Sequence, residues 1–134
     1  KPFPISWTED TYLPSQFLCK IFKKLRSLFP ISILLNLSNP NKVIETFGMT
    51  ALEGMSAALP VIVPTVGGIA EFVEDGVNGY KIDVQNIDLI ASKIREILSD
   101  RELYCKLSNA AISTASKFTS EQMCNCIEKT FLKS

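Results

Sequence analysis

Apolar residues form two short and almost unbroken runs in the first half of the chain. These runs cover residues 31–38 and 60–64 and are rich in branched side chains. Runs of this length without polar alternation are typical of strands that are buried on both faces of a parallel sheet. A third, shorter strand is expected at residues 80–82.

Longer stretches repeat their apolar positions every three to four residues, which predicts amphipathic helices. One helix is expected at residues 15–29, where Pro30 ends it. A second helix is expected to open near Phe47, between the first two strands. The remaining helices are expected at residues 86–98, 101–117 and 120–132.

Glycines mark the connection between the second and third strands. Gly67 and Gly68 form a loop that leads into a short helix ending near Glu74. Asn78 and Gly79 then predict a tight turn with positive φ, and this turn alone accounts for both residues.

The alternation of strands and helices predicts an α/β fold with a Rossmann-like, doubly wound parallel sheet. Such a domain normally has about five or six strands, and only three are expected here. No linker or internal repeat divides the chain. Residues 1–134 are therefore interpreted as one unit that corresponds to the second half of such a domain.

Composition excludes some classes of function. The 14 basic and 14 acidic residues cancel, so no excess charge favours a nucleic-acid partner. The chain has no histidine, which is the commonest general acid or base and the commonest metal ligand, and we expect no metal site. The four cysteines lack CxxC spacing and are expected to be reduced thiols.

The compartment is expected to be the cytoplasm. The opening KPFPISW does not resemble a signal peptide, and no apolar stretch reaches the ~18 residues of a membrane-spanning helix. The predicted helix at residues 15–29 carries Lys20, Lys23, Lys24 and Arg26 beside its apolar stripe. This pattern favours a packed helix with a solvated basic face and leaves open peripheral attachment to the inner face of the membrane.

The segment ETFGMTALE, from Glu45 to Glu53, has the features of an anion site flanked by carboxylates. The first amides of a helix have no acceptor within it, so those of Gly48, Met49 and Thr50 can hold a diphosphate. Glu53 lies five residues after Gly48, which is about 7.5 Å further along the helix. The two carboxylates can therefore bind hydroxyls on either side of the diphosphate. The alternative is that both glutamates are solvated charges and the turn is only a connection.

Residues 31–118 resemble the donor-binding domain of retaining glycosyltransferases with the GT-B fold, family 4, the group 1 glycosyltransferases. The resemblance rests on ETFGMTALE, EGMSAALPVIVPTVGG and IAEFVEDGVNGYKI, in the order and spacing of that family. It implies a C-terminal, nucleotide-sugar-binding domain. The N-terminal acceptor domain is expected to be absent from these 134 residues.

The resemblance implies roles for both carboxylates. Glu45 is implied to be catalytic, facing the transferred sugar and orienting it without attacking it, and Glu53 is implied to bind the ribose hydroxyls. Gly67 and Gly68 correspond to the paired glycines of the family near the donor site. Direct contact of these glycines with the ligand is an alternative to a simple turn.

The residues between the carboxylates are implied to bind substrate through the backbone. Thr46, Phe47 and Gly48 would present backbone groups to the sugar. Met49 and Thr50 would give amides to the diphosphate. The side chain of Phe47 is expected to belong to the core.

The implied activity is transfer of a sugar from a nucleotide diphosphate sugar to a glycan or lipid-linked acceptor, with retention and without a cofactor, as in polysaccharide biosynthesis. In this family an Arg and a Lys upstream neutralise the leaving diphosphate. The 44 residues before Glu45 contain no glycine-rich segment of that kind. We therefore expect the isolated chain to bind the donor weakly and to transfer nothing.

Two other classes of protein compete with this activity. A non-catalytic module that binds nucleotide sugars or another protein is the alternative, since the cationic segment is missing. A dinucleotide-binding dehydrogenase is disfavoured because no GxGxxG follows a predicted strand.

Overall fold

The structure, a computed structural model, describes residues 32–118 and the separate residues 122, 125, 128 and 129. The helix predicted at residues 15–29 lies outside the described residues. Most of the helix predicted at residues 120–132 lies outside them as well.

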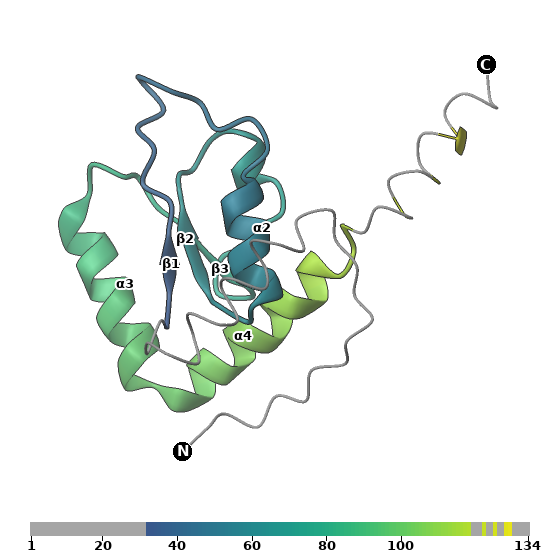
Figure 1. The fold of residues 1–134 in the computed structure, drawn as a ribbon. Helices are drawn as coiled ribbons and strands as arrows, with labels where there is room; N and C mark the ends of the chain where they lie inside the picture. Colours follow the sequence, from purple (N-terminus) through teal and green to yellow (C-terminus); the bar gives the residue numbers. More distant parts are fainter. Residues whose placement is uncertain (1–31, 119–121, 123–124, 126–127, 130–134) are drawn as a thin grey trace.

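Three parallel strands form the sheet, in the order β1-β2-β3 (Figure 1). β1 spans Leu34–Leu35, β2 spans Val61–Val63 and β3 spans Gly79–Lys81. All three coincide with runs predicted as strands, and their parallel order confirms the predicted α/β class. Each strand is short, because only the central residues of each run pair with a neighbour.

β1 differs from its prediction. The run at residues 31–38 was expected to be buried on both faces, but Leu35 and Leu37 are 43% and 44% exposed. Two backbone bonds attach this segment to β2, from Leu34 N to the Pro60 carbonyl (3.0 Å) and from Asn36 N to the Ile62 carbonyl (2.9 Å). β1 lies at the edge of the described sheet, so its second face is covered less than that of the central strand.

The helices α2, α3 and α4 span Met49–Ser56, Ile87–Ser99 and Arg101–Ala115. Side-chain caps explain where the last two begin. Asn86 Oδ1 accepts from Leu89 N (3.1 Å) at the start of α3. At the start of α4, Asp100 Oδ1 accepts from Glu102 N and Leu103 N (2.9 and 3.0 Å). Both helices lie within about two residues of their predicted bounds, which is the usual uncertainty of helix ends.

The short helix predicted up to Glu74 is a single 3₁₀ turn, η1, at Gly68–Ala70. The prediction that Asn78 and Gly79 form a turn with positive φ is wrong, because neither residue has a positive φ. The positive φ in this connection, besides that of Gly67, belongs to Gly76 (+71°), and Gly79 opens β3. A Cβ on Gly79 would collide with the Val61 carbonyl oxygen, so glycine here allows close strand pairing.

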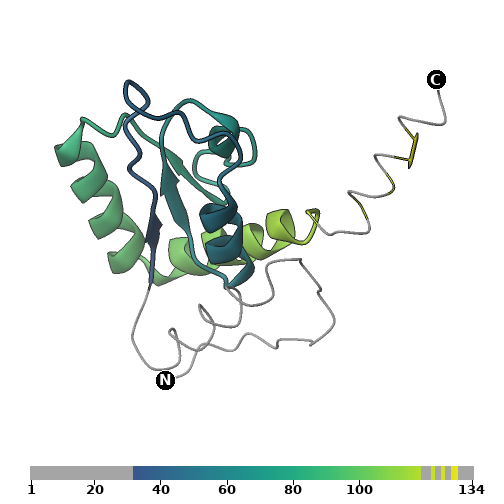
Figure 2. The ribbon, with the colours of Figure 1, turned by 45° about the horizontal axis from the view of Figure 1, so that its top comes forward.

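α3 lies on one side of the sheet and α2 on the other, while α4 runs beneath both (Figures 1 and 2). Two core clusters result. Val61 and Val63 of β2 pack with α2, whereas Ile62 packs with α3. α4 contributes to both clusters, to the α2 side and to the α3 side. Within the described ranges, no helix is long and apolar enough to cross a membrane.

Candidate functional site

The loops after β1 and β2 meet at the carboxyl edge of the sheet. A Cβ on Gly67 would lie 2.6 Å from the carbonyl oxygen of Glu45. A Cβ on Gly68 would lie on top of the carbonyl oxygen of Thr46, far inside the 3.0 Å that real Cβ atoms keep. The prediction that both loops reach one edge is therefore confirmed. The paired glycines have a structural reason, because the two backbones touch there.

Gly48 is fixed by two independent constraints. Its φ is +75°, and it is the N-terminal cap residue of α2. A Cβ at this position would lie 2.5 Å from Ile69 Cγ1. Only glycine combines the left-handed conformation with this approach to η1.

Glu45 lies in the loop, half-buried, and its Oε1 accepts a hydrogen bond from Gly48 N (3.2 Å). The amide of Gly48, which was expected to be open to a ligand, is therefore occupied by the chain itself. Glu45 lies three residues before the N-cap residue Gly48, and its side chain therefore caps the amide of Gly48. Glu45 keeps its second oxygen for other partners.

The amides of the first turn of α2 differ in whether they have an acceptor. Ala51 N and Leu52 N both donate to the carbonyl of Gly48 (3.0 and 3.2 Å). Within the described part of the chain, the amides of Met49 and Thr50 donate to no acceptor, and both residues are exposed. These are the groups that the sequence assigned to a diphosphate.

Glu53 is only 3% exposed, and among the described residues its carboxylate has no hydrogen-bond or ion-pair partner. Burial raises the pKa of the Glu53 carboxyl above its ordinary value. A helical side chain leans toward the N-terminus, so we expect this carboxylate to lie over the turn that carries Met49 and Thr50. The interpretation of Glu53 as a solvated charge is therefore wrong. Groups with a perturbed pKa cluster at functional sites, so Glu53 is a candidate binding residue.

Glu53→Gln is expected to raise the free energy of unfolding at neutral pH by about 1 kcal/mol, the scale of the cost of an unpaired buried group. Because burial raises the pKa of folded Glu53, the folded chain binds the proton more tightly than the unfolded chain. Stability therefore falls as pH rises from the unfolded pKa through the folded pKa. Above this window glutamine is the more stable variant, and below it the advantage disappears.

Denaturant unfolding at about pH 3.5, below the ordinary glutamate pKa, and at about pH 7 measures this difference. An equal effect at both pH values would contradict a buried, ionisable Glu53. The matched control is Glu102→Gln, because Glu102 is exposed in the first turn of α4. Its substitution should change stability little at either pH.

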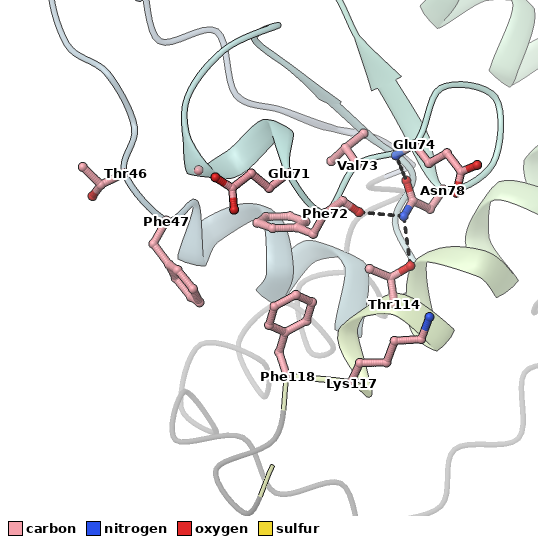
Figure 3. A pocket seen from close by; sticks show the side chains of 11 residues that line it. Thr46, Phe47, Glu71, Phe72, Val73, Glu74, Asn78, Thr114, Lys117 and Phe118 are labelled. Carbon is pink, nitrogen blue, oxygen red and sulfur yellow. Dashed lines mark hydrogen bonds between the residues drawn. The ribbon is translucent and has the colours of Figure 1, made fainter. Parts of the chain in front are cut away.

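Phe47 is not a core residue, contrary to the expectation. Its side chain is 41% exposed and stands edge-on to Phe118, with ring centroids 6.5 Å apart and an angle of 80° between the planes. Phe118 makes a second edge contact with Phe72 at 5.7 Å. Three aromatic rings from distant parts of the sequence therefore meet beside the loop (Figure 3).

A pocket of about 420 Å³ opens beside these rings. It shares Thr46, Phe47 and Gly68 with the site predicted from the sequence, and Glu45 and Glu53 do not line it. No sequence signal indicated the contributions from α4 and its end, because no motif connects them to ETFGMTALE. The lining residues are Thr46, Phe47, Gly68, Glu71, Phe72, Val73, Glu74, Asn78, Thr114, Lys117 and Phe118.

Asn78 supports the wall of this pocket. It is 3% exposed, and its Oδ1 accepts from Glu74 N (2.8 Å). Its Nδ2 donates to the carbonyl of Phe72 and to Thr114 Oγ1, both at 2.9 Å (Figure 3). The side chain therefore connects the loop before β3 with α4.

Comparison with known proteins identifies the family. The family model of glycosyl transferases group 1 matches residues 17–114. An uncharacterised glycosyltransferase of Methanocaldococcus jannaschii is 36% identical over 87 residues, which cover 65% of this chain and 25% of that protein. The lipopolysaccharide 1,2-N-acetylglucosaminetransferase of Salmonella typhimurium is 34% identical over 91 residues, which cover 67% of this chain and 24% of that protein.

A solved structure agrees with the fold. The crystal structure of the C-terminal domain of a glycosyl transferase group 1 family protein from Francisella tularensis has a TM-score of 0.59 and 24% identity. The match covers 85% of this chain and 51% of that one. The chain belongs to the group 1 glycosyltransferase family, and its fold is that of a GT-B C-terminal domain. It spans a quarter or less of the length of the two curated relatives.

Proposed function

We propose that this chain is the donor-binding part of a retaining family 4 glycosyltransferase. The parent enzyme would transfer a sugar from a nucleotide diphosphate sugar to a glycan or lipid-linked acceptor. The observation that carries this proposal is the buried Glu53, whose carboxylate has no partner among the described residues. It follows Met49 and Thr50 by one helical turn, and the amides of these two residues donate to no described acceptor. A carboxylate and free amides at one helix start suit hydroxyls next to a diphosphate.

In this proposal each group has a separate task. Glu53 accepts hydrogen bonds from the ribose hydroxyls, and the amides of Met49 and Thr50 bind the diphosphate. Because charge on the diphosphate grows as the glycosidic bond breaks, these amides stabilise the transition state more than the bound donor. Glu45, held at one oxygen by Gly48 N, presents its other oxygen to the sugar.

The position of Glu45 fits an orienting role better than a nucleophilic role. Its carboxylate is fixed by a turn of the backbone, so that the sugar can be held in one pose. Thr46 and Phe47 lie within this turn and offer backbone groups to the same sugar. The proposed reaction uses neither a metal nor another cofactor. The proposed compartment of the parent enzyme is the cytoplasm, at the inner face of the membrane if the enzyme attaches peripherally.

The name of one relative supports the proposed acceptor class. The Salmonella relative is named as a lipopolysaccharide 1,2-N-acetylglucosaminetransferase, which supports a lipid-linked glycan as the acceptor of the parent enzyme. A non-catalytic module is the second candidate. It is favoured by the Gly48 amide, which the chain itself occupies.

Nucleotide binding by the whole chain tests the proposal. Uridine, guanosine and adenosine diphosphates are added in separate thermal unfolding experiments. At about 100 times the dissociation constant, the matching nucleotide stabilises the chain by about 2.7 kcal/mol. Glu53→Gln should bind about ten-fold more weakly, because a hydrogen bond to a charged group contributes about 1.5 kcal/mol.

The exposed Glu102→Gln serves as the control and should bind the nucleotide like the natural chain. If none of the three nucleotides stabilises the natural chain, the donor site is not intact. The non-catalytic module is then the better interpretation. If a nucleotide binds but Glu53→Gln binds equally well, the assignment of Glu53 is wrong.

A further inference from the structure

We propose that Phe118 is a positioning residue of the donor site and that it acts through Phe47. This inference rests on the proposed function. Phe118 follows α4 and lies 71 positions after Phe47 in the sequence. Its ring nevertheless contacts Phe47 in the loop that carries Glu45.

The described contacts of the loop are of three kinds: a hydrogen bond, backbone packing and a ring pair. The hydrogen bond from Gly48 N to Glu45 Oε1 closes a turn, and Phe47 lies inside that turn. Gly67 and Gly68 pack against the backbone of Glu45 and Thr46. Among the described residues, the aromatic partner of the Phe47 ring is Phe118. Because Phe47 lies between the two residues that this hydrogen bond joins, we expect a shift of its ring to move the turn and with it the Glu45 carboxylate.

Phe118 is itself firmly placed. Its backbone N–H donates to the carbonyl of Ala115 (3.1 Å), the last residue of α4, which is buried in the core. Its ring also meets Phe72 edge-on and packs against the cluster on the α2 side of the sheet. Phe118 is thus attached to the end of α4 and packed against the core, whereas Phe47 is 41% exposed. Both rings line the pocket. Among the described residues, this ring pair is the aromatic contact that connects the loop to the end of α4.

The edge-to-face geometry predicts that position 118 needs an aromatic side chain for full nucleotide affinity. Edge-to-face pairs contribute beyond their apolar area, so leucine at position 118 keeps apolar contact but loses the pair. Phe118→Leu is expected to weaken nucleoside diphosphate binding about five-fold, a factor within the strength of one such pair. Phe118→Tyr keeps the ring and should restore affinity to within about two-fold of the natural chain.

The experiment uses the full chain and whichever of uridine, guanosine or adenosine diphosphate stabilises it. Dissociation constants are measured by titration at a temperature where every variant is folded. Leu103→Ala is the matched control, because Leu103 is another partly buried residue of α4, packed on the opposite side of the sheet. It should destabilise the chain while leaving the dissociation constant unchanged.

The amide resonances of Thr46, Phe47 and Gly48 give a readout that needs no ligand. Phe118→Leu should shift them, and Phe118→Tyr and Leu103→Ala should not. Unchanged affinity and unchanged resonances in Phe118→Leu would overturn the proposal. If no nucleotide binds the natural chain, the proposed function fails, and the resonances alone then decide whether Phe118 positions the loop.

Discussion

Gly68→Ala is expected to lower the free energy of unfolding by about 3 kcal/mol, the upper range for inserting an atom into a packed site. The new Cβ would collide with the carbonyl oxygen of Thr46, and the next atoms in its way also belong to the backbone. A backbone cannot rotate aside as a side chain can. The loop from Glu45 to Gly48 must therefore move, and nucleotide binding should be lost together with stability.

Chemical denaturation and nucleotide titration measure both effects. Gly76→Ala is the control in the same connection, since a Cβ there has no neighbour within 4 Å. Its φ of +71° costs an alanine about 1 kcal/mol, and affinity should be kept. A Gly68→Ala chain as stable as the natural one, with unchanged affinity, would show that the two loops do not touch in solution.

Asn78→Ala is expected to destabilise the chain by about 3 kcal/mol, because each buried group that loses its partner costs about 1 kcal/mol or more. Three hydrogen bonds disappear, those with Glu74 N, the Phe72 carbonyl and Thr114 Oγ1. The loop before β3 then loses its attachment to α4.

Variants of the same network separate these bonds. Thr114→Val keeps the shape of threonine and removes one acceptor, so it should cost about 1 kcal/mol. Asn109→Ala removes an exposed asparagine of α4 and should have little effect. Equal stabilities of Asn78→Ala and Asn109→Ala, measured by denaturant unfolding, would contradict the role of Asn78.

Much of the fold could be predicted because the apolar runs and the helix caps indicate the same strands and helices. Apolar runs at residues 60–64 and 80–82 coincide with β2 and β3, and the caps Asn86 and Asp100 place α3 and α4. The predicted burial of Leu35 was wrong for a different reason. A pattern reports that a residue is apolar, whereas its burial depends on which neighbour covers it in space.

The candidate site was predictable in its composition but not in its internal contacts. The chain order brings Glu45 and Glu53 to one helix start, which spacing can indicate. The bond between Glu45 and Gly48, the burial of Glu53 and the ring of Phe118 against Phe47 depend on side-chain conformation and tertiary packing. No local signal carries such information.

The two-sided packing of α4 has a consequence for synthesis of the protein. Tyr104 and Leu107 complete the cluster on the α3 side, and Ala111 and Ala115 complete the one on the α2 side. A nascent chain that has left the ribosome only as far as Asp100 exposes apolar surface on both faces of its sheet. Because α4 completes both clusters, we expect the growing polypeptide to be prone to aggregation until α4 has emerged.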